Sequence, residues 1–195
     1  MTRDEAAASR VQDWLWKAFE TGVRGDLFDR LLAAQRADLR PVSVADMVQA
    51  YRTHDPAIGL LPGTADLLDD LRRQGVRLGV LSDGPLASQQ AKSTALDLPA
   101  WFDPIVLTDA RVGMAKPAIT GFEWIASQWA LPATTMAYVG DNPLKDFAGP
   151  RRLGWRTVRV RMPLQVTCRI PTPDDARRPD VEVPDLRAAV AYLRS

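Results

Sequence analysis

The sequence predicts an α/β protein, with a doubly wound parallel sheet and a helical lobe at its amino-terminal end. From about residue 60 onward, segments with the apolar pattern of strands alternate with segments of helical periodicity, and parallel strands need such crossover helices. Residues 1–58 have helical periodicity and no convincing strand. We therefore expect a helical lobe in residues 1–58 and an α/β core in residues 59–195.

The amino-terminal lobe is expected to hold helices between residues 4 and 53. Apolar residues recur at intervals of three and four in its first two segments, which Gly22 and Gly25 separate. Ser43 precedes another segment of helical periodicity, where its hydroxyl can cap the first turn. Because these helices do not follow the strand and helix rhythm of the remaining chain, we expect them to pack beside the sheet.

The core elements follow one another in alternation. A helix predicted from residue 64 ends at Gly75, since glycine commonly closes a helix. A Pro-rich loop is expected at residues 163–179. The strands are expected at residues 76–82, 102–108, 134–140, 155–162 and 181–183, and the remaining helices at residues 87–96, 119–130, 143–154 and 184–194.

Composition excludes several classes of protein. Lys and Arg total 25 against 24 acidic residues, so no net field favours nucleic acid or a membrane surface. Cys168 is the only cysteine, which excludes an internal disulfide framework and indicates a reducing compartment. No apolar run approaches the ~20 residues of a membrane span, and the first residues lack a signal-peptide core. We expect a cytoplasmic protein without nucleic-acid or membrane partners.

Polar residues follow three of the expected strands, at the carboxyl ends where ligands bind in an open parallel sheet. Ser82 ends the first strand and is followed by Asp83, Lys116 lies after the second, and Asp141 follows the third. A hydroxyl and an ammonium group suit phosphate oxygens, whereas a carboxylate pair suits a hard divalent cation such as Mg²⁺. Taken singly, Ser82 would also be explained as a cap at a strand end, and Lys116 as a solvated lysine.

Residues 137–150 supply the carboxylate pair. Gly140 lets the backbone turn, and Pro143 suits the first position of a helix, so Asp146 is expected about one turn into that helix. Helical side chains lean toward the amino terminus, so the carboxylate of Asp146 can point back at Asp141. Alternatively, the two acids only stabilise the start of the helix, at about 0.3–1 kcal/mol each.

In this order, the motifs resemble those of the haloacid dehalogenase-like (HAD) hydrolase superfamily. A strand ending in Ser or Thr resembles VRLGVLSDG, a Lys followed by Pro resembles GMAKP, and a Gly-Asp turn with a second acid resembles YVGDNPLKD. The resemblance covers roughly residues 60–193, and the three motifs together are far more specific than any one.

The resemblance also implies roles for these residues. Ser82, Asp83 and Lys116 would form the phosphate-binding group, and Lys116 would also neutralise the charge of the nucleophile. Asp141 would help hold Mg²⁺, and Asp146 would support the metal directly or through water. The amino-terminal lobe would be the cap that closes over substrate.

The first motif of the superfamily has no counterpart in the sequence. That motif is a hydrophobic strand followed by Asp-x-Asp, which carries the nucleophile and the acid/base, and no Asp-x-Asp occurs here. The loss is large, because a general acid alone typically raises the rate of such a reaction by ~10²- to 10⁴-fold. In the superfamily this strand lies between those that would end at Ser82 and Asp141. We therefore expect the first core strand to be missing, with a gap of about 10 Å or two unpaired edges in its place.

Three explanations are open. The first, which we favour because the other motifs are intact, is a truncated amino terminus, with the nucleophile motif upstream of residue 1. The second is a degenerate member that binds a phosphorylated ligand or a protein partner without turnover. The third is an unrelated doubly wound binding domain that matches by chance.

The favoured explanation predicts a Mg²⁺-dependent phosphomonoester hydrolase that acts on a small phosphorylated substrate. Because the nucleophile is absent from the sequence, the 195-residue chain is expected to have little or no activity. If the central slot is empty, the chain should be marginally stable or should self-associate through the unpaired strand edges.

Overall fold

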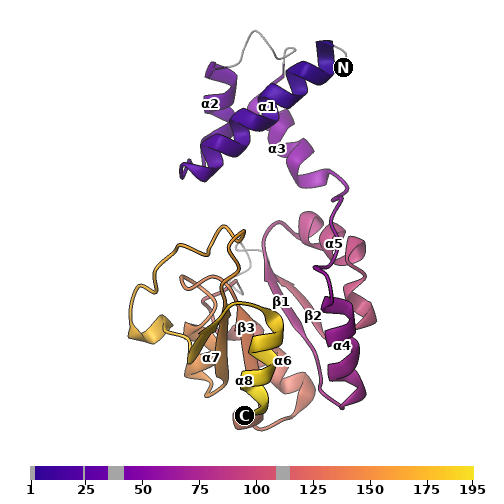
Figure 1. The fold of residues 1–195 in the computed structure, drawn as a ribbon, viewed down its shortest axis with the longest axis vertical. Helices are drawn as coiled ribbons and strands as arrows, with labels where there is room; N and C mark the ends of the chain where they lie inside the picture. Colours follow the sequence, from indigo (N-terminus) through magenta and orange to yellow (C-terminus); the bar gives the residue numbers. More distant parts are fainter. Residues whose placement is uncertain (1–2, 24, 35–41, 109–114) are drawn as a thin grey trace. The chain divides into compact units, whose positions relative to one another are not determined.

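The structure, a computed structural model, describes residues 3–23, 25–34, 42–108 and 115–195 (Figure 1). The chain divides into two compact units, Met1–His54 and Asp55–Ser195. The sequence pattern predicts a boundary slightly later, after residue 58. All the candidate site residues lie in the second unit.

The first unit is built from helices. They are α1 (Arg3–Glu20), α2 (Leu27–Ala34) and α3 (Val44–Thr53). Helix α2 contacts both α1 and α3. The predicted cap of α3 is confirmed, because Ser43 Oγ accepts a hydrogen bond from Asp46 N at 3.1 Å and Asp46 Oδ2 accepts one from Ser43 N at 3.0 Å. This reciprocal pair satisfies N–H groups that the start of a helix would otherwise leave free.

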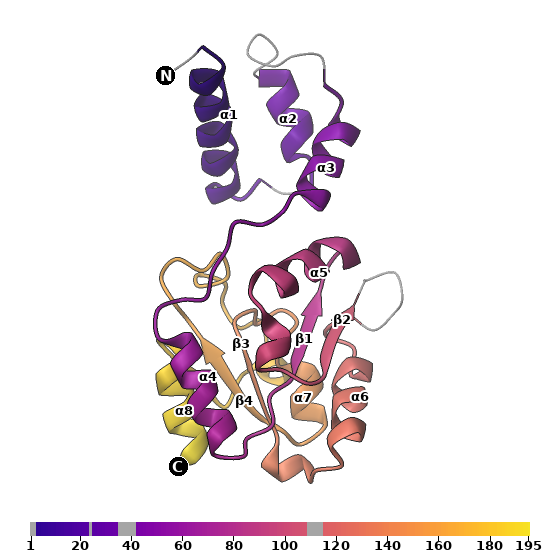
Figure 2. The same ribbon diagram turned by 90° about the vertical axis from the view of Figure 1, so that its right-hand side faces the viewer.

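The second unit alternates helices and strands, which confirms the predicted α/β fold. Its strands are β1 (Val80–Asp83), β2 (Ile105–Thr108), β3 (Ala137–Gly140), β4 (Arg156–Val160) and β5 (Val181–Val183). Its α-helices are α4 (Thr64–Arg73), α5 (Leu86–Ala95), α6 (Thr120–Trp129), α7 (Ala148–Arg152) and α8 (Leu186–Arg194). All the strand pairs are parallel. Helices α5 and α6 contact β2, and α8 contacts β4 and β5 (Figure 2).

The strands form two sheets rather than one continuous sheet. Strand β1 pairs with β2, and β3 pairs with β4, which in turn pairs with β5. Within the described ranges, no strand pairing joins β1 to β3. Each of these two strands therefore has one edge without a partner strand, which fits the expected loss of a strand between them.

A hydrophobic cluster bridges the two sheets. Phe122, from the helix α6 that contacts β2, is fully buried and meets Tyr138 of β3 with ring centroids 5.0 Å apart. The Phe122 ring also meets Trp155, just before β4, at 5.8 Å. Both contacts are edge to face, a favourable geometry for aromatic pairs. Side-chain packing thus connects two sheets that share no strand pairing.

The helix predicted from Pro143 is wrong at its start. Helix α7 begins only at Ala148, and Asp146 lies in the turn before it. Asp146 N nevertheless donates to Asn142 O at 2.9 Å, the spacing of a helical hydrogen bond. The turn therefore winds in the helical sense without continuing as one helix, and it directs the Asp146 carboxylate as the sequence predicts.

Candidate active site

The turn after β3 is built around the Asp146 carboxylate. Asp146 is 2% exposed, and its Oδ2 accepts hydrogen bonds from Asp141 N at 3.1 Å and Asn142 N at 2.8 Å. A methyl group at Gly140 would lie 2.6 Å from Asp146 Oδ2. Only glycine leaves room for the carboxylate at this point, so Gly140 and Asp146 together set the course of the backbone at Asp141.

The Lys116 side chain reaches this turn from the segment after β2. Its ammonium group lies 2.9 Å from Asp146 Oδ1 and 2.7 Å from Tyr138 Oη, and the side chain is 7% exposed. Asp146 Oδ1 accepts no hydrogen bond of good geometry within the described part of the chain, so this contact is an ion pair. Burial raises the pKa of Tyr138 well above its ordinary value, and the charge of Asp146 adds to the effect. Tyr138 is therefore neutral at pH 7, and its oxygen can accept a hydrogen bond from Lys116.

Asp83 connects the end of β1 to the same cluster. Its Oδ1 accepts hydrogen bonds from Thr108 Oγ1 at 2.5 Å and Lys116 N at 3.2 Å, and its Oδ2 lies 3.1 Å from Lys145 Nζ and 4.0 Å from Lys116 Nζ. Burial alone would raise the pKa of Asp83. The Thr108 hydrogen bond and the charge of Lys116 outweigh burial, so the pKa lies below the usual range.

Ser82 lies beside this cluster in the chain, but its hydroxyl points elsewhere. Ser82 Oγ donates a hydrogen bond to Gln89 Oε1 of α5 at 2.5 Å. A methyl group at Gly84 would lie 2.6 Å from Gln89 Nε2, so the turn after β1 packs closely against the same side chain. The structure thus brings Asp83 and Asp146 together around Lys116, whereas the Ser82 hydroxyl is hydrogen-bonded to Gln89 and does not contact this cluster.

Asp141 presents its carboxylate at the end of β3. Thr167 Oγ1 donates to Asp141 Oδ2, and no described residue donates to the other oxygen, Oδ1. No group of three or more His, Cys, Asp or Glu side chains that could hold a metal occurs among the described residues. The Asp141 oxygen that accepts no hydrogen bond from a described residue suits a cation such as Mg²⁺, which commonly uses one or two carboxylates and completes its shell with water and phosphate oxygens.

The charge balance of these side chains supports that fit. The carboxylates of Asp83, Asp141 and Asp146 are balanced by the charges of Lys116, Lys145 and Arg159. A divalent cation at Asp141 would leave this group with a net positive charge, which favours a phosphate dianion.

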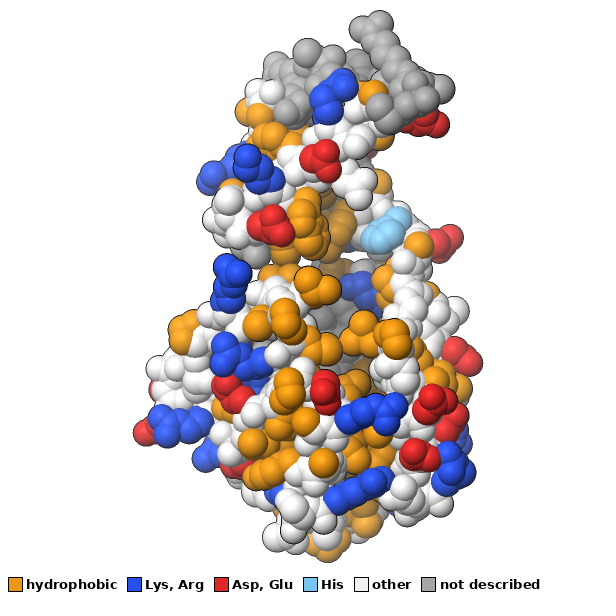
Figure 3. Space-filling view, in the orientation of Figure 1, with side chains coloured by type: hydrophobic (Ala, Val, Ile, Leu, Met, Phe, Trp, Pro, Cys, Tyr) orange, Lys and Arg blue, Asp and Glu red, His pale blue; other side chains and the backbone are white. Residues whose placement is uncertain are grey.

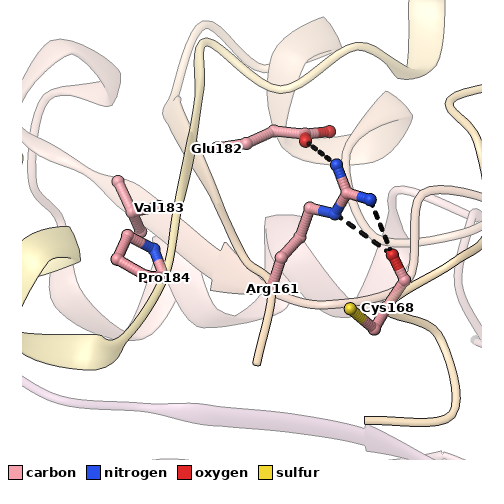
Figure 4. A pocket seen from close by; sticks show the side chains of 5 residues that line it. All are labelled: Arg161, Cys168, Glu182, Val183 and Pro184. Carbon is pink, nitrogen blue, oxygen red and sulfur yellow. Dashed lines mark hydrogen bonds and ion pairs between the residues drawn. The ribbon is translucent and has the colours of Figure 1, made fainter. Parts of the chain in front are cut away.

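A pocket of about 390 Å³ lies at the carboxyl ends of β4 and β5, apart from the predicted residues. It is lined by Arg161, Cys168, Glu182, Val183 and Pro184 (Figure 4). Arg161 donates to the Cys168 carbonyl through Nε at 3.1 Å and Nη2 at 2.8 Å, and through Nη1 to Glu182 Oε2 at 2.8 Å. Because these contacts occupy each nitrogen of the Arg161 guanidinium, the pocket offers a ligand little unpaired positive charge.

Several members of the cluster escape the sequence motifs. Tyr138 and Lys145 both lie inside the quoted YVGDNPLKD stretch, yet neither is one of the residues that define that motif. Arg159 gives a clearer signal, since an arginine inside the apolar strand TVRVR is unusual for a buried position. Thr167 lies in the Pro-rich loop, where the sequence gives no indication of its contact with Asp141.

A parallel α/β unit with charged side chains gathered beyond its strand ends has the architecture of the doubly wound proteins, in which ligands bind at that edge. The sequence identifies the family, because residues 4–154 match the model of the haloacid dehalogenase-like hydrolase family. The chain belongs to this family.

Several of the curated relatives are named as phosphatases. The chain is 31% identical to the glyceraldehyde 3-phosphate phosphatase of Methanocaldococcus jannaschii over 139 residues, which cover 70% of this chain and 60% of that protein. It is 30% identical to the phosphoserine phosphatase of Thermus thermophilus over 156 residues, which cover 80% of this chain and 59% of that protein. The chain therefore spans about three fifths of the length of these relatives.

Solved structures share the fold. The HAD hydrolase YfnB from Bacillus subtilis, crystallised with magnesium, superposes with a TM-score of 0.61 at 19% identity, covering 100% of this chain and 84% of its own. The L-2-haloacid dehalogenase from Xanthobacter autotrophicus superposes with a TM-score of 0.58 at 21% identity, covering 97% and 84% of the two chains.

No helix in the described part of the chain combines the length and apolar character needed to cross a bilayer.

Proposed function

We propose that this protein is a Mg²⁺-dependent phosphomonoester hydrolase that acts on a small phosphorylated substrate in the cytoplasm. The observation that carries the proposal is the buried Lys116 ammonium, held between Tyr138 of β3 and Asp146 of the turn after it, and 4.0 Å from Asp83 at the end of β1. A lysine side chain is rarely buried unless paired. The Lys116 ammonium is paired with Asp146, whose other oxygen binds the backbone of Asp141, and a positive charge at this turn suits a transferred phosphoryl group.

The proposed phosphate-binding group is Ser82, Asp83 and Lys116. The Ser82 hydroxyl would leave Gln89 to donate to a phosphate oxygen, and Lys116 would neutralise phosphate charge. The Asp83 carboxylate is already engaged by Thr108 and two lysines. We therefore assign Asp83 the task of orienting Lys116, with only its backbone facing phosphate.

Asp141 is the proposed ligand for Mg²⁺, and Asp146 supports it indirectly. The bound cation would withdraw charge from the phosphate oxygens. Because Asp146 Oδ2 is occupied by two backbone N–H groups and Oδ1 faces Lys116, its proposed part is to hold the Asp141 turn rather than to bind the metal directly.

The described residues contain no Asp-x-Asp nucleophile motif, and we propose that a strand carrying it fits between β1 and β3. Both strands have an unpaired edge on the described part of the chain. Val139 of β3 is 36% exposed, although strands of parallel sheets are normally buried on both faces. Hydrophobic side chains are also exposed among charged ones over the middle of the α/β unit (Figure 3). We propose that this strand precedes α1 and that Met1–His54 serves as the cap.

Hydrolysis of p-nitrophenyl phosphate tests the proposal. The 195-residue chain is compared with a chain extended at its amino terminus by the coding sequence immediately upstream. We expect Mg²⁺-dependent turnover only in the extended chain, and its loss in Asp141→Asn. Robust turnover by the 195-residue chain, or turnover by the extended chain that Asp141→Asn leaves unchanged, would refute it.

The alternative function is a binding module for a phosphorylated ligand or a protein partner, without turnover. The observation that favours it is the absence of Asp-x-Asp from the sequence. It predicts that inorganic phosphate or Mg²⁺ binds in calorimetry, while neither the 195-residue nor the extended chain hydrolyses the aryl phosphate. The unpaired edges of β1 and β3 also predict concentration-dependent self-association of the 195-residue chain, measurable by sedimentation.

A further inference from the structure

The buried guanidinium of Arg159 ties three segments of the chain together. Arg159 lies in β4 and is 1% exposed. Its Nε donates to Asp141 O at 3.2 Å, its Nη2 donates to Thr167 O at 2.9 Å and Ile170 O at 2.8 Å, and its Nη1 lies 3.0 Å from Glu182 Oε1. A buried charge is tolerated only when its hydrogen bonds are satisfied. Arg159 meets that condition by joining the Asp141 turn, the Pro-rich loop and β5.

Arg161, which directly follows β4, strengthens the same arrangement. Glu182 Oε1 accepts a hydrogen bond from Arg159. Figure 4 shows the contacts of Arg161, which donates to Glu182 Oε2 and to the Cys168 carbonyl. Burial alone would raise the pKa of Glu182, but the hydrogen bonds from the two arginines lower it, so the carboxylate stays ionised at neutral pH. The loop around Thr167 is therefore held by two arginines that share one carboxylate.

This anchoring of the loop fixes the direction of the Asp141 carboxylate. With its backbone held by Arg159, Thr167 donates its hydroxyl to Asp141 Oδ2. A carboxylate bonded on one oxygen loses rotational freedom, so the other oxygen, Oδ1, has a defined direction. Outer partners that orient a metal-binding carboxylate in this way typically change metal affinity by about 10- to 100-fold.

We infer that Thr167 and Arg159 are positioning residues for Asp141, which they orient to bind a divalent cation through Oδ1. This inference rests on the proposed role of Asp141 as a metal ligand. It assigns the Pro-rich loop a part in the site that the sequence motifs do not contain.

Binding of Mn²⁺, a hard cation used in place of Mg²⁺ because its free form is measured by electron paramagnetic resonance, tests the inference without any turnover. We expect Thr167→Val to weaken Mn²⁺ binding about 10- to 100-fold. Thr167→Ser keeps the hydroxyl and should bind nearly as wild type, as should Thr172→Val in the same loop. Urea unfolding of each variant establishes that the folded state is compared.

The guanidinium is tested with a matched pair. Arg159→Gln should weaken Mn²⁺ binding as Thr167→Val does and should open the loop to proteolysis. Arg161→Gln loosens the same loop at Cys168 but leaves the Asp141 contact, so its effect on Mn²⁺ should be much smaller.

The outcomes distinguish the proposed metal-binding role of Asp141 from the inferred positioning role of Thr167 and Arg159. If the wild type binds no Mn²⁺, or Asp141→Asn binds as well as the wild type, then the proposed metal role fails and the inference with it. If Asp141→Asn weakens binding while Thr167→Val does not, or if Thr167→Val tightens it because the hydroxyl competes with the cation, then the inference alone is overturned.

Discussion

The two ends of the candidate site, at Asp141 after β3 and at Ser82 in β1, differ in how firmly their polar groups are held. On the Asp141 side nearly every polar group already has a partner, whereas on the Ser82 side the hydroxyl makes a single hydrogen bond with a described residue, Gln89, which directs it away from Lys116 and Asp146. The Asp141 turn is braced by the Asp146 carboxylate, by Arg159 and by Thr167. The Ser82 hydroxyl meets only Gln89 among its described partners. Preorganised groups need no rearrangement when a ligand arrives, so we propose that the Asp141 side is preformed, whereas the Ser82 hydroxyl has to leave Gln89 before it can bind phosphate.

The largest expected effect comes from removing the brace of the preformed side. Asp146→Ala removes the closer of the two carboxylates that face the buried Lys116 ammonium and frees two backbone N–H groups. Breaking a buried pair in this way costs about 3–5 kcal/mol of stability, measured by urea unfolding. Asp175→Ala, whose ion pair with Arg178 is exposed, is the control and should stay within about 0.5 kcal/mol of wild type. Equal losses in the two variants would contradict a braced turn.

A smaller loss is expected from crowding the same brace. Gly140→Ala would put a methyl group 2.6 Å from Asp146 Oδ2, and such overpacking costs about 1–3 kcal/mol. Gly59→Ala is the matched control, since a methyl group there meets nothing within 4 Å. If both variants unfold at the same urea concentration as the wild type, then the Asp141 turn does not depend on the close contact between Gly140 and Asp146.

The pH dependence of unfolding probes Asp83, which lies between the two sides. Because its folded pKa is depressed, its contribution to stability is present above the unfolded value of about 3.9 and is lost as the pH falls through the folded pKa. Wild type should therefore lose stability on acidification below about pH 4 more steeply than Asp83→Asn. Identical slopes for the two proteins in urea unfolding would show that the Asp83 contacts do not favour its charged form.

The smallest expected loss of stability belongs to the adjustable side. Ser82→Ala removes one half-buried hydrogen bond to Gln89, worth about 0.5–1.5 kcal/mol. Because Gln89 can turn toward solvent, the loss should lie at the low end, as measured by urea unfolding. A loss as large as that of Asp146→Ala would mean that Ser82 belongs to a rigid network and would remove the contrast between the sides.

The sequence predicts what local patterns determine. The order of helices and strands follows from apolar periodicity, and the Ser43 cap follows from residues three positions apart. The helix expected from Pro143 does not run continuously, because Pro150 has no N–H to donate to the carbonyl of Asp146 and its ring opposes a regular helix through that turn. The Arg159 and Thr167 contacts join segments far apart in the chain, and no local pattern encodes such pairing.

Calorimetric titration with inorganic phosphate, with and without Mg²⁺, tests the central claim most directly, because it asks whether one site uses both sides. The account predicts that Mg²⁺ strengthens phosphate binding, that Asp141→Asn removes this enhancement, and that Ser82→Ala weakens phosphate binding whether or not Mg²⁺ is present. Phosphate binding that is indifferent to Mg²⁺ and to both substitutions would contradict a shared phosphoryl-transfer site at these strand ends.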